Sequence, residues 1–480
     1  MSDPRIALLD EAAGADGADA FALAKRLDST EVIVRIDQKQ AAVGLSLVNL
    51  VARLIPNVRV DAVTTPVAIA PFGHGPLTEL ARRVTNAARP GPGRPVQGSY
   101  VIDVGLGRPH ADLYVAADEW SLVLSPVPIA ETPEHSSRGP ASVAASALAT
   151  GEIIRRVLPE LPGVRLSDPF HWNLVDYRTR PAGTSIPNVH VDATLFGAGS
   201  VGSSLTYALL IGAAHGRITA VDADSLRSRN KLRYPLWIDP ASGKKVAWLA
   251  SFSSDRLQII PAPMTASAWI DAADAVEVAV AAVDNGPARR DIVDLLARTT
   301  LNAGVDGLQM HVATHHLADG FACVYCPYVD LADPADETDV YVELTGLSAE
   351  RVARLLGDEI LTAEDIGVMR KAGRLRADDN LIGGRIIDLA RDHLYAQATA
   401  KIGVTTLAVS APHVSAMAGA LLAAELLKIS ARSEHVVDRR VDVDCSGYPT
   451  GFTSRPLVDR SGRCLCHHPV RQRLYRDRWS

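Results

Sequence analysis

The sequence predicts an α/β protein built from doubly wound, Rossmann-like and mainly parallel sheets in two related lobes. Three observations support this fold. Strand-like and helical stretches alternate through the C-terminal half, a glycine-rich turn joins a strand to a helix, and two segments of the N-terminal half recur in the C-terminal half. The length of 480 residues suits two or three ordinary domains.

Composition narrows the classes of partner. Hydrophobic residues make up 47% and charged residues 22% of the chain, as in a folded globular protein. A net charge of -6 leaves no basic excess for a nucleic acid, so we expect small molecules or proteins instead. No apolar run reaches the ~18 residues of a membrane span, and the N-terminus lacks the pattern of a signal peptide. Five cysteines do not make a disulfide framework, so we expect a cytoplasmic protein without membrane contact.

Two internal repeats relate the halves of the chain. Residues 142–155 align without gaps with residues 415–428, and residues 43–47 align with residues 201–205. The alternative is a chance similarity between alanine-rich helices. A stretch rich in Arg, Pro, Gly and Thr at 176–186 is typical of a linker, so we expect domains at 1–185 and 186–480.

The elements follow in order. Strand-like runs cover residues 31–36, 189–196, 218–222, 258–261, 276–283 and 301–306, and a helical run covers 202–214. Residues 329–400 break this alternation because they are charged and mainly helical in pattern. They predict an inserted segment on the ligand edge of the sheet, with helices at 349–356 and 386–398.

A glycine turn is the first candidate site. Gly197, Gly199 and Gly202 follow a strand and open a helix, which allows a phosphate to approach the helix N-terminus closely. Asp222 ends the next strand, where it can bind ribose hydroxyls. The N-terminal copy has Lys39 and Ala41 in place of the first two glycines, so we expect that half to have lost its phosphate loop.

The residues after Asp222 favour one class of nucleotide chemistry. Asn230, Arg233 and Lys245 follow it, and Asp284 comes directly after the 276–283 strand. Hydride transfer has no need of such a cluster, whereas nucleotidyl transfer needs fixed cations and a metal to meet charge on the phosphates.

This pattern resembles the ubiquitin-activating-enzyme-like superfamily of ThiF-type adenylyltransferases, which includes enzymes of thiamine and molybdopterin biosynthesis and of microcin maturation. The resemblance covers roughly residues 186–330 and 403–468. It implies that the three glycines cradle ATP and that Asp222 binds the ribose. It further implies that Asn230, Arg233 and Lys245 hold the triphosphate and that Asp284 positions Mg²⁺.

The chain departs from the family at three neighbouring positions. Where the family has Ser-Asn-Leu-x-Arg-Gln, this chain has Arg229, Lys231 and Tyr234 at the first, third and last positions. The asparagine and the arginine are kept, so the resemblance still implies ATP binding, while contacts to the acceptor would differ.

Two cysteine pairs predict a structural zinc site. Cys323 and Cys326 form a Cys-x-x-Cys pair, and Cys464 and Cys466 form a Cys-x-Cys pair, which together supply the four thiolates of a closed tetrahedral site. His467 lies three residues after Cys464 and is the alternative to Cys466 as the fourth ligand. Unliganded buried cysteines are the remaining alternative.

The other cysteine and the histidines are given no chemistry. Cys445 follows two carboxylates, which would raise the pKa of its thiol and weaken it as a nucleophile, so we interpret it as a strand residue. His311, His315 and His316 cluster in sequence near the first cysteine pair. Such histidines are more often polar residues in structural roles than ligands, so we assign them no chemistry.

The resemblance implies a pseudo-dimer in which the N-terminal half is a degenerate adenylation domain and the C-terminal half is active. The expected reaction is activation of the C-terminal carboxylate of a small protein or peptide as an acyl-adenylate. A homodimer is a further alternative for the quaternary structure. The family often borrows an arginine from the partner lobe; candidates are Arg5, Arg26, Arg178 and Arg180. The alternatives are a catalytically weak substrate recruiter and, on the glycine turn and Asp222 alone, an NAD-dependent oxidoreductase.

Overall fold

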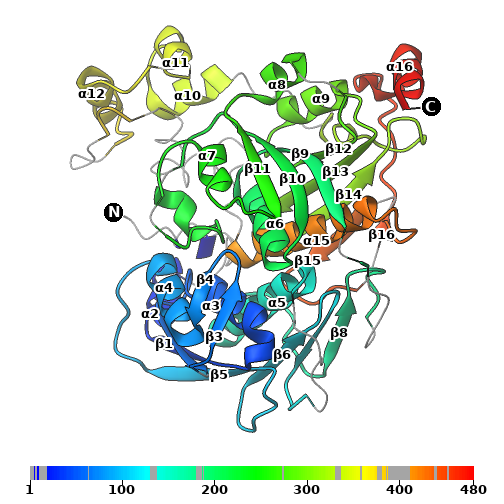
Figure 1. Ribbon diagram of the computed structural model, residues 1–480. Coiled ribbons are helices and arrows are strands. Elements are labelled where there is room, and N and C mark those ends of the chain that lie inside the picture. The colour runs from blue at the N-terminus through cyan, green and yellow to red at the C-terminus, as the bar shows by residue number, and fades with distance from the viewer. Residues whose placement is uncertain are drawn as a thin grey trace. The chain divides into compact units, whose positions relative to one another are not determined.

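The computed structural model divides the chain into two compact units, Met1–Pro327 with Val409–Ser480 and Tyr328–Ala408. The structure describes residues 5, 8–9, 19–62, 64–129, 138–179, 186–187, 189–226, 228–239, 241–272, 275–329, 337–356, 359–375, 381–384, 386, 411–436, 440–450 and 453–479. The first unit contains two large sheets, one from each half of the chain (Figure 1).

The N-terminal sheet has six strands in the order β2-β1-β5-β6-β7-β8. Its strands are β1 (Thr30–Ile36), β2 (Asn57–Ala62), β5 (Gly98–Val104), β6 (Leu113–Ala117), β7 (Ser121–Ser125) and β8 (Phe170–Asn173), beside a hairpin of β3 (Pro66–Ile69) and β4 (Gly73–Pro76). Its helices are α2 (Ala20–Asp28), α3 (Ala41–Val51), α4 (Leu77–Ala88) and α5 (Pro140–Val157). Strands β2, β1, β5 and β6 are parallel, while β7 and β8 are antiparallel to their neighbours.

The C-terminal sheet has eight strands in the order β11-β10-β9-β12-β13-β14-β15-β16. Its strands are β9 (His190–Phe196), β10 (His215–Val221), β11 (Leu257–Ala262), β12 (Val278–Ala281), β13 (Thr299–Asp306), β14 (Gln309–His315), β15 (Arg440–Asp444) and β16 (Thr453–Ser454). Its helices are α6 (Ser200–Ile211), α7 (Lys245–Ala250), α8 (Ala266–Ala272), α9 (Gly286–Asp294), α15 (Pro412–Ser430) and α16 (Pro469–Trp479). The five strands from β11 to β13 are parallel, and β14, β15 and β16 continue antiparallel.

The two sheets share one topology. Each strand pair from β2 to β8 has the same relative direction as the corresponding pair from β10 to β15, and β11 and β16 are additions to the second sheet. In both sheets the chain winds first to one side of a central strand and then to the other, which is the doubly wound arrangement. The predicted Rossmann-like α/β fold is therefore confirmed.

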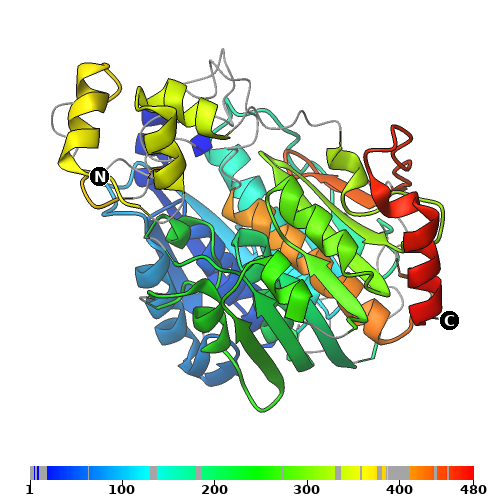
Figure 2. The same cartoon turned by 90° about the horizontal axis from the view of Figure 1, so that it is seen from above.

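The helices of the two sequence repeats meet between the sheets. Helices α5 and α15 carry one repeat, α3 and α6 carry the other, and α15 contacts both α5 and α6 (Figure 1). Figure 2 shows α15, in orange, running across the face of the green strands. By length and composition α15 could cross a membrane, but 89% of its most apolar window is buried in this core. Its hydrophobicity therefore serves packing between the halves.

Each long repeat helix receives a tyrosine from the opposite half. Glu425 and Lys428 of α15 form an ion pair and are both fully buried. The Tyr177 hydroxyl, from the loop after β8, donates to Glu425 at 2.5 Å, and its ring lies 4.3 Å from the Lys428 ammonium. This buried ion pair is thus completed by a side chain from the N-terminal half.

The corresponding group in α5 is built in the same way. Glu152 pairs with Arg155 at 3.2 Å, and the Tyr448 hydroxyl, from the loop after β15, donates to Glu152 at 2.8 Å. Arg155 also donates to the Cys445 carbonyl at 2.9 Å, as Lys428 donates to the carbonyls of the loop after β8. This reciprocal exchange matches the two repeats in space as well as in sequence.

The second unit is small and helical. It contains α10 (Glu337–Thr345), α11 (Ala349–Leu356) and α12 (Ala363–Lys371), packed around a core that includes Leu344, Val352 and Met369. The prediction of a helix at 349–356 is confirmed. The predicted helix at 386–398 lies, apart from its first residue, outside the described residues.

Two further expectations concern strand and domain limits. Cys445 is not a strand residue, because β15 ends at Asp444 and the chain turns there. The proposed linker at 176–186 is described only at 176–179 and 186, so a domain limit at residue 185 stays a prediction.

Candidate functional site

The candidate site lies at the carboxyl edge of the second sheet. Strand β9 is central, with β10 on one side and β12 on the other, so the chain changes winding direction between β9 and β12. Ligands of open α/β sheets bind in the crevice at such a switch point. The backbone joins the two sides closely, since the Ala282 amide donates to the Phe196 carbonyl at 2.9 Å.

The three glycines of the turn have different roles. Gly197 adopts φ +92°, and a Cβ there would lie 2.5 Å from the Ala282 carbonyl oxygen. A Cβ on Gly202 would lie 1.9 Å from the Gly197 carbonyl oxygen. These two glycines are required for the backbone to fold. Gly199 differs, because the nearest atom to its Cβ position is the Tyr234 hydroxyl oxygen at 3.9 Å, so this face of the turn is open.

Asp222 ties the glycine turn to the end of β10. Its Oδ2 accepts from the Ala198 amide at 2.8 Å, and its Oδ1 accepts from the Asp224 amide at 2.8 Å. The Lys245 ammonium lies 3.6 Å from Asp222 and 2.7 Å from Asp224. Burial acts to lower the pKa of Lys245, but Tyr234, Asp222 and Asp224 together hold that pKa above its ordinary value. The cation is therefore retained beside the turn.

Asn230 and Arg233 belong to a short 3₁₀ segment, Ser228–Leu232, and the residues directly after it. Asn230 is buried, and its carbonyl accepts from the amides of Arg233 and Tyr234 at 3.0 Å. Lys231, one of the departures from the family pattern, donates to the Arg89 carbonyl at 2.9 Å and so engages the N-terminal half.

An arginine missed by the sequence analysis holds this segment. Arg53, fully buried at the end of α3, donates to the carbonyls of Lys231, Pro235 and Trp237, the last two at 3.2 Å. Burial lowers the pKa of Arg53 to about 9. Among the four arginines considered from sequence, Arg5 pairs with Asp28, Arg26 with Glu160 and Arg178 with Asp176, all within the N-terminal half, while Arg180 lies outside the described residues.

Asp284 lies in an ordered loop after β12. Its side chain is exposed, while the neighbouring Asn285 caps α9 by accepting from the Ala288 amide at 2.8 Å. Arg289, buried beneath the loop, donates to the Val283 carbonyl at 2.6 Å and to the Asn302 side chain. The loop is thus fixed from below, and the Asp284 carboxylate remains accessible at the switch point.

The equivalent crevice of the first sheet is filled. Gln40 precedes α3 where the glycine turn precedes α6, and its buried amide exchanges two 3.0 Å hydrogen bonds with the backbone of Ala117 at the end of β6. A Cβ on Gly105, at the end of β5, would lie 2.4 Å from the Gln40 side chain. A side chain therefore occupies the position that the open turn leaves free in the second sheet.

The four cysteines of the two pairs converge. The sulfur atoms of Cys323, Cys326, Cys464 and Cys466 all lie within 4.8 Å of one another, and all four residues are buried. Cys323 lies 3.7 Å from Cys326 and 3.5 Å from Cys464, and Cys326 lies 3.5 Å from Cys466. Four sulfurs at ~2.3 Å from a tetrahedral zinc ion would be roughly 3.8 Å apart, so this cluster could hold a metal ion with little movement.

The thiol cluster does not include His467. The Nδ1 atom of His467 lies 3.1 Å from the Gln472 amide nitrogen, and Cys466 supplies the sulfur beside Cys326. Cys445 is buried elsewhere, and its pKa is raised to about 12, first by burial and then by Asp444. The predicted direction of that shift is confirmed, but burial is its larger cause.

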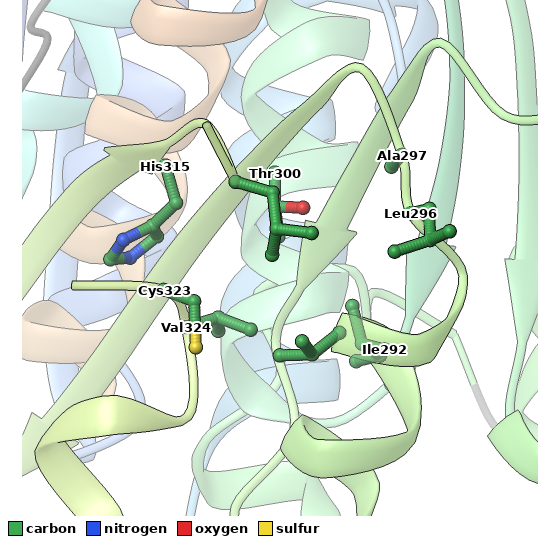
Figure 3. Close-up of a pocket in the computed structure, with 9 residues that line it drawn as sticks. Ile292, Leu296, Ala297, Thr300, His315, Cys323 and Val324 are labelled. Carbon is green, nitrogen blue, oxygen red and sulfur yellow. The ribbon is translucent and has the colours of Figure 1, made fainter. Parts of the chain in front are cut away.

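The histidines near the cluster make structural contacts. The Nδ1 atom of His315 lies 2.7 Å from the Ala322 carbonyl oxygen, and burial lowers the pKa of His315 to about 4. Figure 3 shows a small pocket beside Cys323, lined by His315, Thr300 and mainly apolar side chains such as Ile292 and Val324. It borders the thiol cluster, and none of its lining residues belongs to the glycine turn.

No protein-family model and no curated protein matches the sequence. Among solved structures, E. coli MccB matches at 13% identity and a TM-score of 0.35, covering 59% of this chain and 66% of that one. E. coli MccB with ATP matches at 12% identity and a TM-score of 0.34, covering 58% of this chain and 66% of that one. PaaA matches at 11% identity and a TM-score of 0.30, covering 56% of this chain and 72% of that one. The chain thus spans just under two thirds of MccB.

Proposed function

We propose that the protein is an ATP-dependent adenylyltransferase that activates the C-terminal carboxylate of a small protein or peptide. One observation carries the proposal. An open glycine turn, a carboxylate tied to that turn, a retained lysine and an accessible carboxylate meet around one switch point, in residues Gly199, Asp222, Lys245 and Asp284. Each of these groups suits one part of a nucleoside triphosphate with its Mg²⁺.

In the proposed reaction, a carboxylate oxygen of the acceptor attacks the α-phosphorus of ATP. The bond from that phosphorus to the bridging oxygen breaks, giving the acyl-adenylate and pyrophosphate. Asp222 would bind the ribose, and Asn230, Arg233 and Lys245 would hold the triphosphate as its charge redistributes. Asp284 would hold Mg²⁺, which supplies further positive charge at the phosphates when bound.

The thiol cluster has a structural part in this proposal. Zinc bound by Cys323, Cys326, Cys464 and Cys466 would tie the segment after β14 to the C-terminal segment, which are far apart in sequence. The cluster shares no residue with the glycine turn, so the metal would stabilise the fold and take no part in the reaction.

Gly199→Val tests the nucleotide site. Because the space beside Gly199 is open, a valine there would meet the ligand rather than the backbone, and ATP binding measured by calorimetry should be abolished with the fold intact. Gly91→Val is the matched control, since nothing lies within 4 Å of its Cβ position. A full equivalent of ATP bound to the Gly199→Val protein would contradict the assignment of the active half.

Asp284→Ala tests the chemistry. Affinity for ATP should fall modestly, while acceptor-dependent exchange of pyrophosphate into ATP should drop by ~10² or more. Asp255→Ala is the control, because Asp255 is also exposed but precedes β11, at the opposite edge of the sheet. The acceptor is found first by screening small proteins and peptides with free C-termini. Exchange near the wild-type rate in the Asp284→Ala protein would refute the metal role, and an ATP-binding failure in the wild type would favour a substrate recruiter.

A further inference from the structure

Tyr234 brings a hydroxyl group to the open face of the glycine turn. Its ring is only 2% exposed and stacks on Trp248 at 5.8 Å with an interplanar angle of 29°. Trp248 in turn packs against Trp237 and Phe252. The ring is therefore fixed in an aromatic cluster, and its hydroxyl oxygen lies 3.9 Å from the Cβ position of Gly199.

This hydroxyl makes no hydrogen bond within the part of the chain that the structure describes. Other buried or partly buried tyrosines differ: the hydroxyl of Tyr207 bonds Ser46 at 2.9 Å, that of Tyr177 bonds Glu425 at 2.5 Å, and that of Tyr475 bonds the Arg298 carbonyl at 2.6 Å. The Tyr234 ring is buried, while its hydroxyl reaches the open face of the turn, where a bound group can accept its hydrogen bond.

The surroundings select the charge of that partner. Arg233 and Lys245 lie within electrostatic reach of the Tyr234 hydroxyl, as do Asp222 and Asp224, the two carboxylates that pair with Lys245. Helix α6 directs the positive end of its dipole at the same space. Burial is the main cause that raises the pKa of Tyr234, so the hydroxyl keeps its proton at neutral pH and can donate it. A donor beside two cations and a helix N-terminus suits an anion with several oxygens.

We propose that the Tyr234 hydroxyl donates a hydrogen bond to a phosphate oxygen of a polyphosphate chain bound at the N-terminus of α6, the chain of a nucleoside triphosphate in the proposed reaction. The inference rests on the proposed function for its ligand but extends it to a residue that the proposed site did not include. It assigns Tyr234 to binding of the phosphates and not of the base, because its hydroxyl faces Gly199.

The test compares the wild type with Tyr234→Phe, which removes only the hydroxyl and leaves the ring against Trp248. Calorimetric titrations use two probes, ATP and inorganic tripolyphosphate, each with Mg²⁺. Affinity for both should fall about tenfold or more, the effect of losing a hydrogen bond to a charged group. Tyr207→Phe is the matched control: it removes a buried hydroxyl bonded to Ser46 and should leave both affinities unchanged. Tryptophan fluorescence and near-UV circular dichroism verify that each variant is folded.

The outcomes separate this inference from the proposed function. Unchanged affinities in Tyr234→Phe would overturn the inference while leaving the adenylyltransferase proposal intact. A loss for ATP alone would also overturn it, since the hydroxyl would then contact the nucleoside. If Tyr234→Phe loses affinity for both probes while the wild type catalyses no exchange, the inference would be supported and the proposed function refuted. A wild type that binds neither probe would refute both.

Discussion

The buried ion pair of α15 gives a direct measure of how the two halves are held together. Lys428→Met removes the cation that pairs with the fully buried Glu425 carboxylate, which still accepts from the Tyr177 hydroxyl. Breaking a buried pair in this way costs about 3–5 kcal/mol of unfolding free energy, because the uncompensated charge remains out of water. Lys428 also donates to the carbonyls of Leu174 and Val175 at 3.2 and 3.0 Å. The loss of these two hydrogen bonds in Lys428→Met lowers the free energy of unfolding further.

The assay is urea unfolding followed by tryptophan fluorescence. Arg82→Met is the control, since Glu79 and Arg82 form an ion pair with the same spacing but on the surface, and its loss should hardly change the midpoint. The double variant Glu425→Gln with Lys428→Met should recover much of the lost stability, because no buried charge is then left unpaired. A Lys428→Met protein as stable as the Arg82→Met protein would refute this account of the interface.

Three other outcomes follow from the described contacts. Purified protein should contain about one zinc ion per chain; Cys323→Ser should release the metal and lower the thermal midpoint, and Cys445→Ser should leave the metal content unchanged. Burial lowers the pKa of His413 from its ordinary value of 6.5 to about 3. The neutral, buried His413 therefore contributes its full stability above pH 6.5. That stability is lost as the pH falls from 6.5 toward 3, at up to about 1.4 kcal/mol of unfolding free energy per pH unit. His413→Leu should therefore narrow the gap between the urea midpoints at pH 7 and at roughly pH 4.5, and an equal gap would contradict the linkage. Arg53→Met should lower the free energy of unfolding by on the order of 3 kcal/mol, since three carbonyls lose their donor. It should also speed amide hydrogen exchange at residues 231–237. Exchange as slow as in the wild type would contradict this role of Arg53.

Much of the fold could be predicted because its signals are local in sequence. The predicted run at 31–36 and β1 differ by one residue, and the glycine turn falls between β9 and α6 as expected. The long repeat was recognisable because both α5 and α15 are buried almost all round, so both are restricted to small and apolar residues.

The contacts between the halves could not be predicted in the same way. Arg53 has no charged motif around it, and its partners are backbone carbonyls, which carry no signature in sequence. Gln40 likewise occurs in an ordinary polar stretch, and only the pairing of β1 with β5 and of β5 with β6 brings it to Ala117. Tyr177 and Tyr448 follow equivalent strands, but the exchange of their hydroxyls between halves depends on how α5 and α15 pack.

These contacts give the N-terminal half a physical role that does not need a nucleotide. Its own crevice is occupied by Gln40, yet Arg53 fixes the segment that carries Asn230, Arg233 and Tyr234 beside the open turn of the other half. The backbone of that segment has few ladder hydrogen bonds of its own, since it is a short 3₁₀ helix followed by a turn. Without Arg53, its carbonyls would be buried without donors or exposed by movement of the segment, and either would displace the residues proposed to hold the phosphates. A half whose own crevice is filled can thus be necessary for the proposed site of its neighbour, because it supplies the order on which that site would depend.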